Sequence, residues 1–208
     1  IVPALCSCGS IGNTSLRMCS ACHRYWKGDR ELTSVGKVIR STWPIKPDYS
    51  AADPDVLESA RDRGTIVDEL FSLYVNGSLT RIPAGTRTDA VDLFLKLKQW
   101  WDKRGESARS QVMLADDEIA GTCDILTADR YIYDIKATYN IEPTYPLQLG
   151  AYADLHDRMF RTRPEVAIVH VTKRFSEPKI IKLDGQECLD DWLKVRAMWQ
   201  VVQKRSHE

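Results

Sequence analysis

The sequence predicts an α/β domain preceded by a small cysteine-containing module. Two runs rich in Ile, Tyr and Thr, Ala120–Leu126 and Arg130–Ala137, flank a short polar break, a pattern typical of a β-hairpin. Segments with apolar residues at helical spacing lie on both sides of this hairpin. Four cysteines are bunched near the start of the chain, before these periodic segments begin.

Length and composition agree with this fold class. The chain has 208 residues, of which 43% are hydrophobic and 28% charged, enough for one domain with a proper core and a small appendage. The formal net charge is zero, which argues mildly against a large basic footprint for nucleic acid, although an acidic metal site would offset basic residues in the total. No apolar run approaches the ~20 residues that span a bilayer, so we expect a cytoplasmic protein without membrane contact.

The cysteine spacing predicts a zinc site. Cys6 and Cys8 form one close pair, Cys19 and Cys22 form another, and a glycine-containing loop joins the pairs. Two such pairs about a dozen residues apart suit tetrahedral Zn²⁺, with two disulfides or four free thiols as the alternatives. We therefore predict a zinc-binding module at residues 1–30 and a second domain at residues 31–208.

Aromatic and basic residues are interleaved at the end of this module. Tyr25 and Trp26 lie among Arg17, Arg24 and Lys27. Such a pattern suits contact with a nucleic-acid backbone and stacking on bases. The alternative is that both rings pack the module onto the next domain, and the sequence does not separate the two.

Three helices are expected in the first half of the second domain. The first covers Leu32–Trp43 and ends before a proline. The second begins after Asp53, with Pro54 at its first position, and runs to about Val75. The third covers Arg87–Lys103, with its two adjacent tryptophans assigned to the core.

Strands and helices alternate in the second half. The remaining predicted segments are a strand at Ser110–Ala115, the hairpin, a helix containing Pro146–Leu155, a buried strand at Glu165–Thr172, a short strand at Lys179–Leu183 and a helix at Cys188–Lys204.

The predicted hairpin carries two carboxylates and an amine. Asp134 and Lys136 project from the same face, because a strand has a side-chain period of two, and Asp124 lies on the partner strand. Burying such a group is costly unless a cation compensates, and Mg²⁺ is often held by one or two carboxylates together with substrate phosphate. The alternative is a surface ion-pair ladder of little energetic weight.

The helix that follows adds Gln148 and Tyr152, four residues apart and hence on one face. The order G-x-x-D, D-x-K, Q-x-x-x-Y, from Gly121 to Tyr152, resembles the PD-(D/E)XK nucleases, in the branch that contains the RecB nuclease domain, lambda-type exonucleases and CRISPR-adaptation nucleases. The resemblance implies a restriction-endonuclease-like core, in which a mixed central sheet is flanked by helices.

The resemblance also implies roles for individual residues. Asp124, Asp134 and the main-chain carbonyl of Ile135 would bind Mg²⁺ or Mn²⁺. Lys136 would be catalytic, and Gln148 and Tyr152 would brace the site or contact DNA.

The chain departs from the family pattern in places. Where the RecB-like branch often has R-G-T-x-x-H, this chain has Arg63, Gly64 and Thr65 followed by Asp68 in the histidine position. Asp68 is a suitable ligand for Mg²⁺ or Mn²⁺, with Glu69 as the alternative, and Gly64 is expected to permit close approach to the site. The resemblance also implies that Gln111 stands where the family often has a further glutamate. Some relatives hold an iron–sulfur cluster with three cysteines after the core, whereas the position of four before it favours zinc.

The resemblance implies a divalent-metal-dependent DNA nuclease, expected to be an exonuclease that acts in DNA processing, recombination or repair. A compact chain without a nucleotide-binding glycine loop suggests a phage or prophage protein, in a bacterial or phage-infected host cell, that forms a homo-oligomer or binds a recombination partner. A different class of function is a catalytically inactive nuclease fold that binds DNA or protein through the zinc module. A third is a redox- or zinc-sensing protein.

Overall fold

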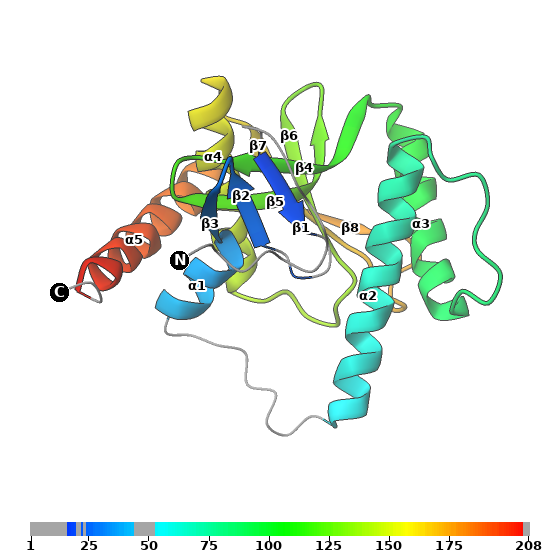
Figure 1. The fold of residues 1–208 in the computed structure, drawn as a ribbon. Helices are drawn as coiled ribbons and strands as arrows, with labels where there is room; N and C mark the ends of the chain where they lie inside the picture. The colour runs from blue at the N-terminus through cyan, green and yellow to red at the C-terminus, as the bar shows by residue number, and fades with distance from the viewer. Residues whose placement is uncertain (1–15, 20–21, 23, 44–52, 206–208) are drawn as a thin grey trace.

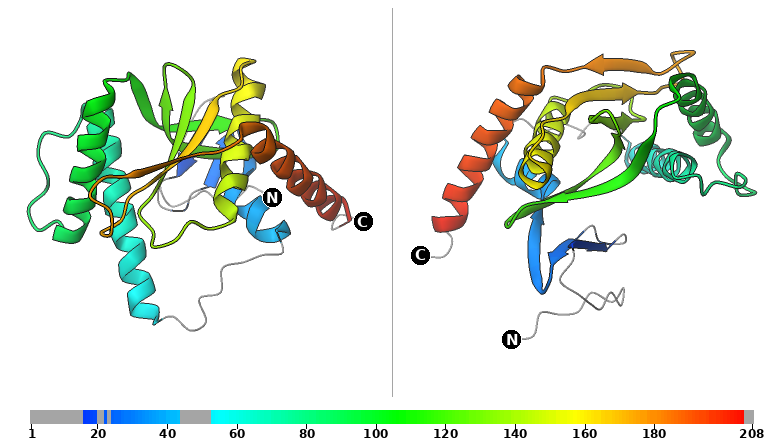
Figure 2. Two further views of the ribbon diagram at one scale, coloured as in Figure 1. Left: turned by 180° about the vertical axis from the view of Figure 1, so that it is seen from behind. Right: turned by 90° about the horizontal axis from the view of Figure 1, so that it is seen from above.

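The computed structural model describes residues 16–19, 22, 24–43 and 53–205 of the 208-residue chain. A mixed sheet lies between two groups of helices, with α2 and α3 on one side and α1, α4 and α5 on the other (Figures 1 and 2). The strands are β1 (Leu16–Cys19), β2 (Arg24–Lys27), β3 (Arg30–Ser34), β4 (Ala108–Ala115), β5 (Ile119–Thr127), β6 (Tyr131–Lys136), β7 (Glu165–His170) and β8 (Lys179–Lys182). The helices are α1 (Val35–Thr42), α2 (Pro54–Val75), α3 (Thr88–Arg104), α4 (Thr144–Phe160) and α5 (Gly185–Arg205). The predicted mixed α/β architecture is confirmed.

The sheet divides at its central strand. Strand order is β1-β2-β3-β5-β6-β7-β8, and β4 pairs with the other edge of β5. Parallel β3 meets the start of β5 at Ile119 and Ala120, whereas antiparallel β6 meets its end at Ile125 and Leu126. Residues 121–124 therefore lie at the fork where β3 and β6 separate, and these are the residues of the G-x-x-D motif.

Two apolar cores cover the two faces of the sheet. One contains buried residues of α1, α4 and α5, and the other contains buried residues of α2 and α3. Alternation along β6 sends Ile132 into the first core and Tyr133 into the second. Cys123 and Ile125 enter different cores although they are two residues apart, so the alternation of β5 is interrupted at Asp124.

Helix α2 forms as the sequence predicts. The Asp53 side chain accepts a hydrogen bond of 2.9 Å from the backbone N–H of Asp55, and Pro54 is the first helical residue. Val67, Leu70 and Phe71 are buried on one face. Since these residues recur every three or four positions, the helix turns one stripe toward α3 and the sheet.

The first predicted helix is partly wrong. Leu32–Ser34 belong to β3, and α1 begins only at Val35. The Ser34 hydroxyl accepts the Lys37 N–H at 3.2 Å and caps the helix. Pairing of Thr33 and Ser34 with β5 draws this segment into the sheet, a long-range contact that local spacing does not encode.

The predicted division at residue 30 falls at the start of β3. Strands β1 to β3 form antiparallel pairs with each other, and β3 continues into the central sheet. The Tyr25 ring is buried, and its hydroxyl lies 3.0 Å from the Thr122 hydroxyl on β5. Tyr25 therefore packs the N-terminal strands onto the core, whereas Trp26 is only half-buried and lies between the guanidinium groups of Arg17 and Arg24, at 5.4 and 5.3 Å from its ring centroid.

Candidate functional site

The hairpin of β5 and β6 brings the predicted carboxylates together. Ile125 pairs with Tyr133, so the same register places Asp124 opposite Asp134 at the fork of the sheet. The backbone N–H of Ile135 donates a 2.7 Å hydrogen bond to Asp124 Oδ2. Asp134 is 1% exposed and lies between Tyr133 and Ile135 in β6. A carboxylate buried in this way requires a compensating charge.

Lys136 provides one compensating charge. Its Nζ lies 2.6 Å from Asp134 Oδ2, donates a 3.3 Å hydrogen bond to Gln148 Oε1, and lies 4.6 Å from the centroid of the Tyr145 ring. Gln148 Nε2 in turn donates to the Tyr152 hydroxyl at 2.8 Å. Lys136, Gln148 and Tyr152, which the sequence placed in one site, thus form a continuous chain of contacts between β6 and α4.

Two glycines allow α4 to approach this closely. A Cβ at Gly121 would lie 2.7 Å from Cε1 of Tyr152, so the glycine of the G-x-x-D motif makes room for this ring. A Cβ at Gly150 would lie 2.1 Å from the carbonyl oxygen of Cys188, where α4 crosses α5. The position of α4, and with it that of Gln148, depends on both glycines.

Asp68 reaches the site from α2. Both of its carboxylate oxygens accept hydrogen bonds from Gln111 Nε2, at 3.2 and 3.0 Å. Gln111 has a φ of +52°. Its neighbours in β4 pair with the residues on either side of Asp124, so Gln111 stands opposite Asp124, but these two residues do not themselves pair. A non-glycine residue in the left-handed region is uncommon, and such strain clusters at functional sites. Glu69 is exposed and shares no such contact, so Asp68 is the carboxylate that faces the site.

Sequence reasoning missed two residues of this site. Tyr145 precedes Gln148 by three positions and Arg61 precedes Asp68 by seven, so each lies on the helix face that carries a predicted site residue. That helical spacing was the available signal. A Cβ at Gly64 would meet no atom of the described residues within 4 Å, so none of these residues requires a glycine there.

Burial and mutual repulsion raise the pKa values of the acidic residues. Burial raises the pKa of Asp68 to about 6, although Lys136 opposes the shift. Burial, followed by repulsion from Asp134 and Asp68, raises the pKa of Asp124 well above its ordinary value. Burial also raises the pKa of Asp134 despite its pairing with Lys136. The single ammonium of Lys136 therefore does not offset the cost of burying three carboxylates in their charged form.

Lys136 itself stays charged. Burial lowers the pKa of an amine, but the attraction of Asp134 and Asp124 outweighs this effect, and the pKa of Lys136 is raised. Burial raises the pKa of Tyr152 well above its ordinary value, so its hydroxyl stays neutral.

The donor set suits a hard divalent cation with few protein ligands. Asp134 Oδ1 is buried and has no hydrogen-bond partner among the residues that the structure describes. When all three carboxylates are ionised, they exceed the charge of the one ammonium by two, which is the charge that one divalent cation neutralises. Without such a cation their raised pKa values favour protonation. Within the described ranges no three His, Cys, Asp or Glu side chains form a group that could hold a metal ion. Mg²⁺ commonly binds one or two carboxylates and completes its octahedron with water and phosphate oxygen, so a pair of carboxylates satisfies its protein share.

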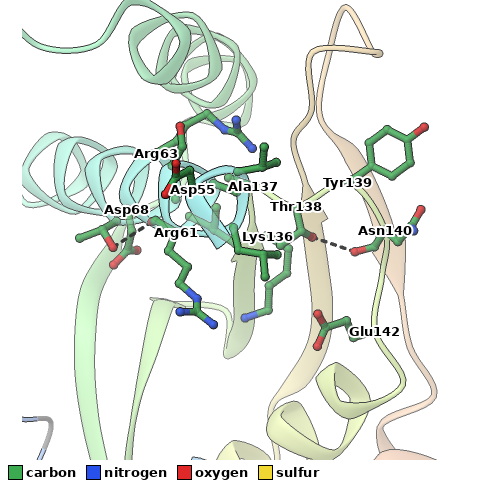
Figure 3. Close-up of a pocket in the computed structure, with 17 residues that line it drawn as sticks. Asp55, Arg61, Arg63, Asp68, Lys136, Ala137, Thr138, Tyr139, Asn140 and Glu142 are labelled. Carbon is green, nitrogen blue, oxygen red and sulfur yellow. Dashed lines mark hydrogen bonds between the residues drawn. The ribbon is translucent and has the colours of Figure 1, made fainter. Parts of the chain in front are cut away.

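A pocket opens onto the site. Its volume is about 1140 Å³, and it is lined by the first half of α2 and by the segment from Ile135 to Glu142. In Figure 3 the guanidinium of Arg61 and the ammonium of Lys136 point into the same hollow, with the Glu142 carboxylate across from them. Gly64 also lines this hollow, so its missing side chain leaves space for a ligand instead of for a neighbouring helix.

The predicted zinc ligands are described only in part. Cys6 and Cys8 lie outside the described residues. Cys19 is buried at the end of β1, and Cys22 is exposed in the turn before β2. Cys19 and Cys22 thus both lie where β1 connects to its paired strand β2, and the zinc site itself stays a prediction.

Several other cysteine, histidine and tryptophan side chains belong to the core or bond the backbone. Cys123 and Cys188 are buried in the core. His156 and His170 are buried, and each ring bonds a backbone carbonyl, at 2.7 Å to Thr162 and 2.8 Å to Thr138. Trp101 is buried and Trp100 packs against the same core. In the part of the chain that the structure describes, every helix is too short or too polar to cross a membrane.

Comparison with solved structures identifies the class of fold. A protein from Eubacterium rectale, named as a candidate exonuclease, superposes with a TM-score of 0.51 over 81% of each chain at 13% identity. The fold is thus the mixed α/β fold of a nuclease-like protein. An alkaline exonuclease from Laribacter hongkongensis matches 85% of this chain and 93% of its own at a TM-score of 0.40 and 12% identity. A phage-related exonuclease from Haemophilus somnus 129PT matches 84% of this chain and 96% of its own, with a TM-score of 0.39 and 14% identity. No family model and no curated protein sequence matches the chain.

Proposed function

We propose that this protein is a divalent-metal-dependent DNA nuclease that hydrolyses phosphodiester bonds. The observation that carries the proposal is the group of Asp68, Asp124 and Asp134, which among the described residues share the one ammonium of Lys136, beside a large pocket that Asp68 and Lys136 line. The motif order from Gly121 to Tyr152, on a nuclease-like fold, supports it. We further propose exonuclease action on DNA ends.

Asp124, Asp134, the Ile135 carbonyl and Asp68 would hold Mg²⁺ or Mn²⁺. Such an ion neutralises phosphate charge and lowers the pKa of a bound water. In this arrangement Gln111 is the residue that orients Asp68, through its two hydrogen bonds.

Lys136 acts as a fixed cation in this proposal. Its raised pKa keeps it protonated, so it stabilises the negative charge that develops on the phosphate during attack by water. Gln148 holds its ammonium, and the neutral Tyr152 hydroxyl holds Gln148. Arg61, which enters the same pocket, would bind an adjacent phosphate.

The test is cleavage of linear and circular DNA with Mg²⁺, with Mn²⁺ and with EDTA. We expect cleavage with either metal and none with EDTA; loss of linear DNA alone would indicate an exonuclease. Lys136→Ala should lower the rate about a thousandfold or more with little loss of DNA binding. Lys182→Ala, an exposed change on β8, is the matched control. Equal rates for Lys136→Ala and the parent would refute the mechanism.

A second candidate function is DNA or protein binding without catalysis. The formal net charge of zero and the absence of a three-ligand metal group among the described residues favour it. In that case no metal would support cleavage, while DNA binding would persist in EDTA.

We also propose that Cys6, Cys8, Cys19 and Cys22 bind a structural Zn²⁺. Cys19 at the end of β1 and Cys22 shortly before β2 would supply half of such a site. Metal analysis of the purified protein should give one zinc per chain, and a site that resists oxidant would exclude a redox-sensing role. Finding no zinc would contradict the proposal.

A further inference from the structure

A second hollow lies beside the catalytic pocket, on the far side of the segment that follows β6. Its volume is about 260 Å³, and it shares Arg63, Thr138 and Tyr139 with the larger pocket. Lys173 and Arg174, in the turn after β7, form its other wall. The nuclease proposal assigns no role to this hollow.

Tyr139 provides a flat and accessible ring at this hollow. It is 66% exposed, although a large aromatic side chain gains stability mainly by burial. The guanidinium carbon of Arg174 lies 3.4 Å from the ring centroid and covers one face of the ring. In Figure 3 the ring points away from the hollow that contains Lys136. The pair is therefore a stacked platform that contributes little to the core.

Hydrogen bonds hold both sides of the platform. The Thr138 carbonyl bonds His170 Nε2 at 2.8 Å, and the Thr138 hydroxyl donates to the Asn140 carbonyl at 2.8 Å. On the other side, the Arg174 N–H donates to the Thr172 hydroxyl at 3.1 Å, and Lys96 Nζ donates to the Thr172 carbonyl at 3.0 Å. A platform fixed before binding loses little conformational entropy when a ligand stacks on it.

Positive charge is in excess beside the platform. Asp89 forms ion pairs with Arg63, Arg87 and Lys173. Arg87 takes both oxygens of Asp89 at 3.0 Å, whereas Arg63 and Lys173 lie at 3.7 and 3.6 Å. The one carboxylate of Asp89 thus pairs with three cations, and it holds two of them, Arg63 and Lys173, only weakly. The Arg63 Nε atom is buried and has no hydrogen-bond partner among the described residues.

An aromatic platform beside two weakly paired cations has the chemistry that binds one nucleotide of a single strand. Bases stack on aromatic rings and phosphates bind cations, without regard to sequence. A base within a duplex is already stacked on both faces, so only an unpaired base could cover Tyr139. Tyr139 follows Lys136 by three residues, so their Cα atoms are at most about 11 Å apart. This distance corresponds to on the order of three nucleotides of DNA at 3.4 Å each.

From this geometry we infer that the hollow is a subsite for an unpaired nucleotide that lies within about three nucleotides of the cleaved bond. The base stacks on Tyr139, and Arg63 and Lys173 bind its phosphate. The inference rests on the proposed nuclease function, because it places the subsite on the path of the same strand. It predicts that the protein prefers DNA with a single-stranded end over blunt duplex.

The test measures DNA binding by fluorescence anisotropy in the full chain carrying Lys136→Ala, which prevents cleavage. The ligands are a hairpin duplex with a blunt end and the same duplex with a five-nucleotide overhang of either polarity. Tyr139→Ala should weaken binding of one overhang about tenfold and of the blunt duplex less than twofold. Tyr139→Phe, which keeps the ring, should bind as the parent does. Phe160→Ala, which removes an exposed aromatic at the end of α4, is the control and should change nothing.

The cations are tested by salt dependence. Arg63→Ala and Lys173→Ala should each lower the slope of log affinity against log salt by about one for the overhang, and Lys182→Ala should not. Equal affinity of Tyr139→Ala and Tyr139→Phe for every ligand would overturn the inference, as would an equal loss on blunt and overhanging DNA. If the parent cuts DNA and Tyr139→Ala behaves as the parent, the subsite fails alone. If the parent cuts nothing while the Tyr139 difference persists, the nuclease proposal fails alone.

Discussion

Two groups of buried charges lie in this fold, and they are compensated in opposite ways. In the first, Asp68, Asp124 and Asp134 share one ammonium group, that of Lys136. In the second, where α4 and α5 meet the turn between β4 and β5, the carboxylates of Asp116 and Asp154 pair with arginines. We call them the site cluster and the arginine cluster.

Both carboxylates of the arginine cluster form ion pairs with arginine. Arg196 contacts Asp116 at 2.5 Å and Asp154 at 2.9 Å, and Arg158 contacts Asp154 at 2.7 Å. The Trp192 indole also donates to Asp154 at 3.1 Å. Burial would raise the pKa of Asp116, but backbone N–H groups and Arg196 more than offset this effect, and the pKa is lowered.

The comparison separates structural from functional burial of charge. Both clusters are removed from water, yet of the two only the site cluster keeps raised carboxyl pKa values. Each cluster holds a buried carboxylate oxygen without a hydrogen bond among the described residues, but that of Asp116 forms an ion pair with Arg196. Only the site cluster opens onto a large pocket. Perturbed pKa values in a cleft are typical of functional sites, whereas a satisfied network is typical of structure.

The largest expected effect on stability comes from the arginine cluster. Arg196→Met should destabilise the protein by about 3–5 kcal/mol, because it leaves buried carboxylates without their cation. Urea unfolding would measure it, with Arg205→Met at the exposed end of α5 as the control. A loss below about 1 kcal/mol would mean that the cluster is not the structural network inferred here.

The two clusters should also give pH dependences of opposite sign. The folded state raises the pKa of Asp68 from 3.8 to about 6, so it binds more protons than the unfolded state between these values. In EDTA, stability should therefore fall as pH rises from about 4 to about 6, by up to about 3 kcal/mol from this group. Urea midpoints against pH would measure it, and Asp68→Asn should flatten the curve. Asp116, with its lowered pKa, contributes stability that is lost only as pH falls below about 4.

Neutralising one member of the site cluster should stabilise the metal-free protein. Asp134→Asn removes an incompletely compensated buried charge, for a gain of about 1–3 kcal/mol in EDTA. The same change should abolish cleavage and any stabilisation by Mg²⁺, which at 100 times its Kd would amount to about 2.7 kcal/mol in the parent. Thermal unfolding with and without Mg²⁺ checks both. Destabilisation by Asp134→Asn in EDTA would mean that the site cluster, like the arginine cluster, stabilises the fold.

The smallest effect concerns the pocket wall. Gly64→Ala should stabilise α2 by about 0.5–1 kcal/mol, since the added methyl group meets no described atom within 4 Å. The same methyl group would narrow the pocket and should raise the KM for DNA more than it lowers kcat. Gly150→Ala, whose Cβ would strike the Cys188 carbonyl, is the contrasting change and should destabilise strongly. Unfolding curves of the two variants give the comparison.

Local signals predicted most of the elements. Helix α2 follows from a capping aspartate, a proline and an apolar stripe, and the β5–β6 hairpin follows from two β-rich runs around a polar turn. The full length of strand β3 did not follow, because Leu32 pairs with Tyr25 of β2 and the last residues, Thr33 and Ser34, pair with β5, more than 80 residues later. No local pattern records such a partner.

The sequence by itself determined the hairpin with Asp124, Asp134 and Lys136, and the α4 face with Gln148 and Tyr152. These relations follow from strand and helix periods, which are set by backbone geometry. Only the tertiary structure decided that Asp68 of α2 lies near these residues, where it accepts hydrogen bonds from the Gln111 amide. The same is true of the contact of Tyr145 with Lys136 and of the stacking of Arg174 on Tyr139. Those contacts join segments distant in the chain, and their energy comes from packing and charge that appear only when the sheet and both helix layers are assembled.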